Sequence, residues 1–452
     1  MRARTLGLAV GLAVGGVVGV AARGQTLVPW PAKIDAAFAP GLGLLAGTVA
    51  AVKTDLLIGA VRHPKRIPLV LVGVAGIAAV KAVAGPSIAR TLLAGLQQNS
   101  RELDPGFATP PTSSFVTGSA ASGIALQQLG REGARYVGQV TTPGDVIAVT
   151  GQPMLAEPIR VFVGVESAPT IAERVRLAMS ELRRTGAFDR KYLLIQSPAG
   201  TGYANSSPVD VLEILTRGDC AAVAIGFGLL PSFLSLGKRK DAAQTQRELL
   251  DAIVAELADR ATPPILLMYG ESLGAGVQEA AVPGGLADLD AYGIANALWV
   301  GTPGSRTADE FHARCAASSV TMDRAEQVPL DRGTERARVW FLEHDGDPVV
   351  RFRGDLIAKR PFWLDPHAPR GRNIPQSMTW KPGITWAQVL VDVLFATNVQ
   401  PGQFESIGHD YRADLGAVTT AAFGLAASAE VATRLENHLR ELELARAARI
   451  AG

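Results

Sequence analysis

Five consecutive residues, Gly270-Glu271-Ser272-Leu273-Gly274, have the G-x-S-x-G spacing that can present a serine as a nucleophile. An apolar run at 265–269 precedes them, and a stretch rich in small residues at 273–281 follows. This context predicts a strand, a tight turn and a helix. The turn would expose the serine hydroxyl at the carboxyl edge of a sheet. Ser272 is therefore the predicted nucleophile.

A nucleophilic serine needs a general base, which is usually a histidine. In a chain with the order serine, acid, histidine, the candidates after the last predicted strand, apart from the near-terminal His438, are His367 and His409. His409 lies in a loop at 406–411, before a helical C-terminal stretch, and is the predicted base. His367 lies in a proline-rich segment and is interpreted as a surface residue.

The base in turn needs an acid that orients it. The loop after the predicted strand 339–344 offers Asp345 and Asp347. Asp347 is preferred because the sequence Asp-Pro-Val-Val places its carboxylate just before the next segment. Asp345 stays open as the alternative, and its other role would be that of a turn residue beside Gly346.

The oxyanion formed during acyl transfer also needs hydrogen-bond donors. One predicted donor is the backbone N–H of Leu273, which follows the nucleophile. The second is expected from Ala199 or Gly200 in the loop 197–202. An ordinary glycine-containing turn explains that loop equally well.

Strands and helices alternate from about residue 157. Continuous apolar strands separated by helices are typical of a mostly parallel sheet with helices on both faces, which is an α/β fold. The predicted strands are 158–165, 191–196, 221–227, 264–269, 297–301 and 339–344, and the predicted helices are 169–185, 208–215, 240–258 and 273–281. We expect a catalytic domain at 151–452 and, at 96–150, a linker with one short structured segment (130–137).

The N-terminal 95 residues are apolar and basic. They contain ten Lys/Arg and two acidic residues, which leaves 34 basic against 40 acidic residues in the rest of the chain. Three apolar runs at 5–22, 36–52 and 67–84 predict a membrane-spanning helical region at 1–95, with Gly7, Gly11, Gly15 and Gly19 on one close-packing face. A cleaved signal peptide is the alternative for the first run. If three helices cross, the positions of the basic residues place the catalytic body outside the cytoplasmic membrane, and a fourth crossing at 55–61 would reverse this orientation.

Other classes of site find little support in the composition. Cys220 and Cys315 are isolated and form no metal-ligand pattern, so the sequence predicts neither a cofactor nor a metal. No basic patch with interleaved aromatic residues is present, so nucleic acid is not an expected partner.

The ordered motifs resemble a bacterial family of α/β-hydrolases with an N-terminal multi-helix membrane domain and a C-terminal catalytic domain. The resemblance covers most of the chain from about residue 100. It rests on blocks at 157–161, 167–170, 184–191, 200–202, 230–232, 270–274, 347–350 and 408–411. It implies the α/β-hydrolase fold, a serine hydrolase of unassigned substrate, and triad roles for Ser272, Asp347 and His409.

These observations predict a membrane-anchored serine hydrolase, esterase-like or lipase-like, that cleaves a lipid or another envelope-associated acyl ester. Two alternatives stay open. An acyltransferase would use the same three residues, and a membrane-tethered partner-binding module would not use them for catalysis.

Overall fold

The chain forms two compact units. The structure, a computed structural model, describes residues 3–21, 26–30, 32–62, 100–229, 236–329, 337–396 and 404–451. The helical unit consists of Met1–Gly95 and Arg351–Ala396, and the sheet unit consists of Leu96–Val350 and Thr397–Gly452. The segment 351–396, which the sequence assigned to the catalytic domain, therefore groups with the N-terminal helices.

The sheet unit is built on seven parallel strands in the order β1-β3-β2-β4-β5-β7-β6. The strands are β1 (Ile159–Val163), β2 (Tyr192–Ser197), β3 (Cys220–Ile225), β4 (Ile265–Glu271), β5 (Ile294–Val300), β6 (Ser319–Met322) and β7 (Val339–Leu342). All six predicted strands are present. The sequence missed β6, an edge strand with only Met322 buried, because it lacks a continuous apolar run.

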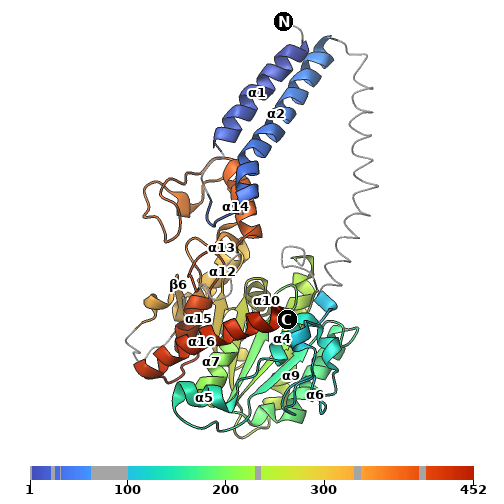
Figure 1. Cartoon of the computed structure of the whole chain (residues 1–452), viewed down its shortest axis with the longest axis vertical. Helices are drawn as coiled ribbons and strands as arrows, with labels where there is room; N and C mark the ends of the chain where they lie inside the picture. The colour runs from blue at the N-terminus through green and yellow to red at the C-terminus, as the bar shows by residue number, and fades with distance from the viewer. Residues whose placement is uncertain are drawn as a thin grey trace. The chain divides into compact units, whose positions relative to one another are not determined.

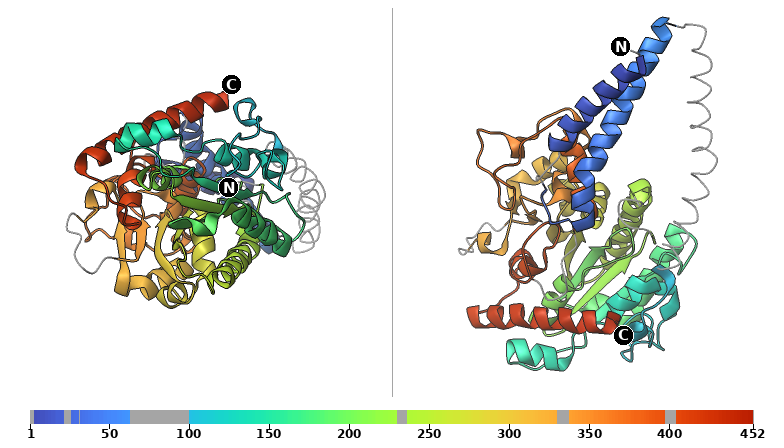
Figure 2. Two further views of the ribbon diagram at one scale, coloured as in Figure 1. Left: turned by 90° about the horizontal axis from the view of Figure 1, so that it is seen from below. Right: turned by 45° about the horizontal axis from the view of Figure 1, so that its top comes forward.

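Helices cover both faces of this sheet (Figures 1 and 2). Helix α9 packs against both α6 and α10 in one layer, and α5, α7, α15 and α16 pack together in another. Their bounds are α5 (Pro143–Thr150), α6 (Ile171–Thr185), α7 (Ser207–Leu215), α9 (Arg239–Leu257), α10 (Leu273–Ala281), α15 (Arg412–Ala422) and α16 (Ala429–Ala451). The shorter helices of this unit are α4 (Gly130–Val137), α11 (Leu286–Ala291), α12 (Arg306–Cys315) and α13 (Pro348–Arg351).

Residues 100–150 differ from the predicted linker. Phe107, Val116, Leu129 and Tyr136 are at most 4% exposed and belong to the same apolar core as the strands. The turn-forming residues that suggested a connector at 101–123 are real, but apolar residues between them pack inward. Only α4 was predicted correctly here. This segment is therefore part of the sheet unit.

The helical unit begins with two helices, α1 (Ala3–Ala21) and α2 (Ala32–Arg62), that lie side by side (Figure 1). A Cβ atom added to Gly15 would lie 2.7 Å from the Gly43 carbonyl oxygen, and one added to Gly19 would lie 3.3 Å from the Ala39 oxygen. The predicted close approach of two glycine-bearing helices is thus present, because only hydrogen atoms separate the backbones there.

The predicted membrane-spanning helices are not found in the described ranges. None of the helices there is both long enough and apolar enough to cross a bilayer. The second predicted run is part of α2, which also carries Lys33, Asp35, Lys53 and Asp55, so its apolar stretch is bounded by charges. The third run, 67–84, lies outside the described residues.

The segment 26–30 is hydrogen-bonded to α14 (Ile384–Leu394) within the helical unit. The Leu27 N–H and the Trp30 indole N–H donate to the Asp392 carboxylate at 3.1 and 2.6 Å. Burial raises the pKa of Asp392 to about 7, although these donors oppose the shift. Around it, Leu27, Trp363 and Val389 join one apolar cluster.

Candidate active site

Ser272 occupies the turn between β4 and α10, as the motif predicted. Its φ of +56° is in the region that side-chain-bearing residues rarely adopt, and its N–H donates to the Val300 carbonyl oxygen at 2.8 Å. Gly274 allows this turn because a Cβ there would collide with the Ser197 carbonyl. The strained serine thus lies at the carboxyl edge of the sheet, before the first turn of α10.

His409 and Asp347 are brought together from segments 62 residues apart. The distance from His409 Nδ1 to Asp347 Oδ2 is 2.6 Å, and both side chains are buried. Asp347 follows β7, and its Oδ1 accepts the Val349 N–H at 2.8 Å, which fixes the carboxylate. Asp347 rather than Asp345 therefore contacts the predicted base. His367, the other histidine considered, is an exposed residue of the helical unit.

Ser272 and His409 line one common pocket. His409 Nε2 is buried and has no hydrogen-bond partner among the described residues. Since Nδ1 is held by Asp347, Nε2 is the ring nitrogen left to exchange a proton with a group in the pocket. A side chain at position 301 would block this arrangement, because a Cβ on Gly301 would lie 2.6 Å from His409 Cε1.

Burial lowers the pKa of His409, but the charge and hydrogen bond of Asp347 outweigh it, with smaller contributions from Glu271 and Asp410. The net effect is a pKa above the ordinary value for histidine. The imidazolium that forms when His409 accepts a proton is consequently stabilised by its surroundings.

A tyrosine that the sequence analysis did not assign to the site completes the contacts of the acid. The Tyr411 hydroxyl donates to Asp347 Oδ2 at 2.6 Å and accepts the His344 N–H at 3.1 Å. Tyr411 is fully buried, and burial together with the Asp347 charge raises its pKa well above the usual value. Because the hydroxyl stays protonated, it is a permanent donor to Asp347.

The loop that carries His409 contacts the side chain of His344, which lies two residues after the end of β7. One ring nitrogen of His344 lies 3.0 Å from the Gly408 carbonyl oxygen and the other 3.0 Å from Asp414 Oδ2. The His344 and Tyr411 rings also stack, with their centroids 4.0 Å apart. The signal that could have found this network is the polar residue His344 two positions after an apolar strand.

The predicted oxyanion donors differ in their hydrogen bonding. Leu273 is the first residue of α10, where backbone N–H groups lack acceptors within the helix. The Ala199 N–H donates to the Tyr203 carbonyl oxygen at 2.7 Å, and the Gly202 N–H donates to Ala199 at 2.9 Å. The Ala199 N–H thus has an acceptor within its own loop, and its role as an oxyanion donor stays a prediction. The role of Gly200 stays a prediction.

The pocket beside Ser272 has a volume of about 420 Å³ and a polar, acidic lining. Its lining residues are Glu132, Ser197, Ala199, Thr201, Tyr203, Asn205, Tyr269, Glu271, Ser272, His409, Asp410 and Arg412. Glu271 accepts hydrogen bonds from the Tyr269 hydroxyl at 2.6 Å and from the Asn205 amide at 2.7 Å. Arg412 is paired with Asp410 at 2.6 Å and Glu132 with Arg135 at 2.9 Å, whereas both donors to Glu271 are neutral groups.

A parallel sheet flanked by helices, with a strained serine and a buried histidine–carboxylate pair at its carboxyl edge, defines an α/β-hydrolase. The sequence matches the Alpha/beta-hydrolase family over residues 159–428. Because that match covers more than half of the chain, the protein belongs to this family.

The solved structures that match this chain resemble it only distantly. Two structures of acetyl xylan esterase are each 14% identical in sequence, with alignments that cover 36% of this chain and 85% of that chain and a TM-score of 0.25. A cutinase-like protein from Cryptococcus sp. is 13% identical, with 36% and 80% covered and a TM-score of 0.24. No curated protein matches the sequence.

Proposed function

We propose that the protein is a serine hydrolase that cleaves carboxylic esters through an acyl-enzyme. The observation that carries this proposal is the buried contact of 2.6 Å between His409 Nδ1 and Asp347 in a pocket that Ser272 also lines. The family and the strained turn at Ser272 support the same reaction. The partner-binding alternative has no comparable support, because a module without catalysis has no need of this arrangement.

In the proposed reaction, His409 Nε2 removes the proton from the Ser272 hydroxyl as its oxygen attacks the ester carbonyl. The resulting oxyanion lies near the start of α10, where the N–H of Leu273 is available and the helix dipole favours negative charge. His409 then gives its proton to the leaving alcohol. Water, activated by the same imidazole, attacks the acyl-enzyme and releases the acid.

The lining of the pocket favours a compact polar ester over a long acyl chain. Tyr203, Asn205 and Glu271 line the same pocket as the serine, and their polar groups would lose solvation against a methylene chain. The Glu271 carboxylate, whose two hydrogen-bond donors are neutral, also disfavours acids and favours neutral polyols or cationic alcohols. We therefore propose a short-chain ester of a polar alcohol. A lipid substrate stays a prediction from the sequence.

A fluorophosphonate probe tests the enzymatic proposal because it labels only activated serines. We expect labelling of the full chain and none of Ser272→Ala. A matched control is Ser207→Ala, which changes a serine at the start of α7 that does not line the pocket. Absence of labelling in the wild-type protein, or labelling that persists in Ser272→Ala, would refute the proposal.

Esters of graded acyl length test the substrate proposal separately. We expect kcat/KM to be highest for acetyl and propionyl esters and to fall for long chains. A steady increase toward long chains would support the lipid substrate and refute the compact one. The two tests are independent, since a probe-reactive serine is compatible with either result.

Location at the cell membrane, with the catalytic body outside the cytoplasm, stays a prediction, as do the bacterial origin and the N-terminal membrane domain that the resemblance implies. Carbonate extraction of cell fractions checks the attachment. Recovery of the full chain in the soluble fraction before extraction would contradict it.

A further inference from the structure

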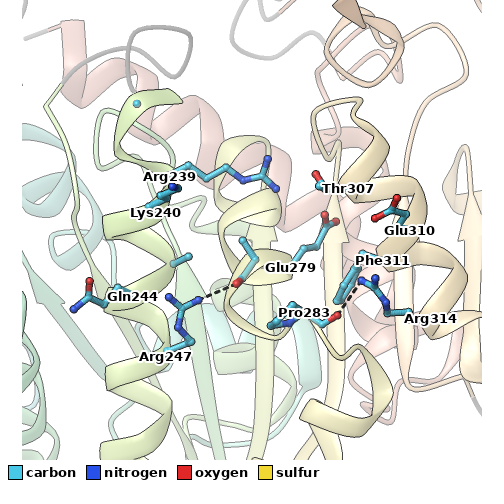
Figure 3. A pocket seen from close by; sticks show the side chains of 13 residues that line it. Arg239, Lys240, Gln244, Arg247, Glu279, Pro283, Thr307, Glu310, Phe311 and Arg314 are labelled. Carbon is cyan, nitrogen blue, oxygen red and sulfur yellow. Dashed lines mark hydrogen bonds between the residues drawn. The ribbon is translucent and has the colours of Figure 1, made fainter.

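A second pocket, of about 860 Å³, lies along α9, α10 and α12 and shares no lining residue with the Ser272 pocket. Its walls carry four basic side chains: Arg239, Lys240 and Arg247 from α9, and Arg314 from α12 (Figure 3). We call it the basic groove. Nothing in the proposed esterase mechanism uses these residues.

Three of the four cations are held in place by backbone carbonyls of α10 or of the residues just after it. The bonds run from Arg239 to Gly276 (2.9 Å), from Arg247 to Ala280 (2.9 Å) and from Arg314 to Pro283 (3.1 Å), and Figure 3 shows the last two. These contacts fix the guanidinium groups and use only some of the five N–H donors that each one has. The end of a helix supplies about half a negative charge, too little to balance three arginines.

Carboxylates do not balance these charges either. None of the four cations forms an ion pair with a residue in the described part of the chain. The two acidic residues of the groove have other partners: Glu310 is paired with Arg306 at 2.9 Å, and Glu279 accepts the Thr302 hydroxyl at 2.7 Å. The groove therefore keeps a net positive charge.

Glu279 has a further neighbour, the imidazole ring of His312. Its carboxylate lies 3.7 Å from His312 Nε2. Burial lowers the pKa of His312, but the Glu279 and Glu343 carboxylates outweigh it and raise that pKa above the ordinary value. When His312 is protonated, its charge offsets the buried charge of Glu279.

We propose that the basic groove binds a phosphate ester. The carbonyls that hold Arg239 and Arg247 are four residues, or about one helical turn, apart on α10, so both guanidinium groups are anchored on neighbouring turns of one helix. Planar guanidinium groups anchored in this way can donate to different oxygens of one phosphate group, and Lys240 adds a third charge. The ester is either a soluble phosphate or a phospholipid head group, which share this chemistry.

Titration calorimetry with glycerol 3-phosphate and co-sedimentation with vesicles test this proposal on the full chain. The vesicles contain phosphatidylcholine with or without phosphatidylglycerol. We expect binding in at least one arm, weakened by salt because the contacts are electrostatic. Binding only to glycerol 3-phosphate identifies a soluble ligand, and binding only to phosphatidylglycerol vesicles identifies a head group. Binding in neither arm would overturn the proposal.

The decisive variants are Lys240→Gln and Arg247→Gln, each expected to weaken binding about tenfold, or about 1.4 kcal/mol. Lys240 has no hydrogen bond or ion pair within the described ranges, so its replacement leaves the fold intact even if that of Arg247 does not. The matched control is Arg176→Gln on α6, whose side chain is 73% exposed. Equal weakening by the control would show non-specific charge attraction and overturn the site.

This proposal and the esterase proposal fail separately. Ser272→Ala is expected to bind glycerol 3-phosphate or vesicles as the wild type does. Lys240→Gln is expected to hydrolyse a soluble short-chain ester at the wild-type rate. Loss of phosphate binding in Ser272→Ala would place the ligand in the Ser272 pocket and refute the groove.

Discussion

Replacing Tyr411 with phenylalanine removes a single hydroxyl group from a fully buried network. That hydroxyl donates to Asp347 at 2.6 Å and accepts the His344 N–H at 3.1 Å. A hydrogen bond to a charged group contributes about 1.5–3 kcal/mol, and an unpaired buried N–H costs about 1–3 kcal/mol. Since relaxation recovers part of this sum, we expect Tyr411→Phe to lower the free energy of unfolding by about 2–4 kcal/mol.

The same substitution is also expected to change the pKa of the general base, His409. With one donor fewer, the Asp347 carboxylate attracts the His409 proton more strongly, so the pKa of His409, which is already raised, moves higher. His409 accepts a proton only when it is neutral, so activity rises with pH through this pKa. The acid limb of kcat/KM is therefore expected to shift upward by about half a unit to one unit, since one unit equals about 1.4 kcal/mol.

Urea unfolding and the pH profile of short-chain ester hydrolysis measure the two effects. Tyr192→Phe is a matched control, because that hydroxyl has no hydrogen bond to a described residue, and it is expected to change neither quantity. An acid limb that does not move in Tyr411→Phe, or one that moves to lower pH, would refute the reasoning about the network.

Three further changes have expected outcomes. Asp347→Asn is expected to lower kcat about 10⁴-fold because it favours the wrong tautomer of His409, whereas Asp345→Asn is expected to cost less than tenfold; equal losses would contradict the choice of acid. Gly301→Ala is expected to lower both activity and the free energy of unfolding, the latter by about 1–3 kcal/mol, because of its φ of +57° and the contact with His409, and normal urea unfolding would contradict this. Asp392 binds its proton more tightly when folded, so its contribution to stability is present below about pH 4 and is lost as the pH rises through about 7; urea titrations across this range should show the loss in the wild type but not in Asp392→Asn.

The local sequence was sufficient for the parallel sheet and for the turn at Ser272. Buried parallel strands need continuous apolar runs, and a serine between a strand and a helix needs small flanking residues. Both features can therefore be predicted from residues that are adjacent in the sequence. The edge strand β6 left no such run and was missed. The order of acid and histidine after the serine narrowed the other two site residues to two candidates each.

Only the tertiary structure decided which of these candidates meet. Asp347 and His409 are 62 residues apart, and their contact depends on how β7 and the loop at 404–411 are placed on one sheet edge. Tyr411, the closure of the Ala199 loop by Tyr203, and the burial of residues 100–150 likewise arise from packing between distant segments. Contacts of this kind have no local pattern, because the free energy that selects them comes from burying many side chains together.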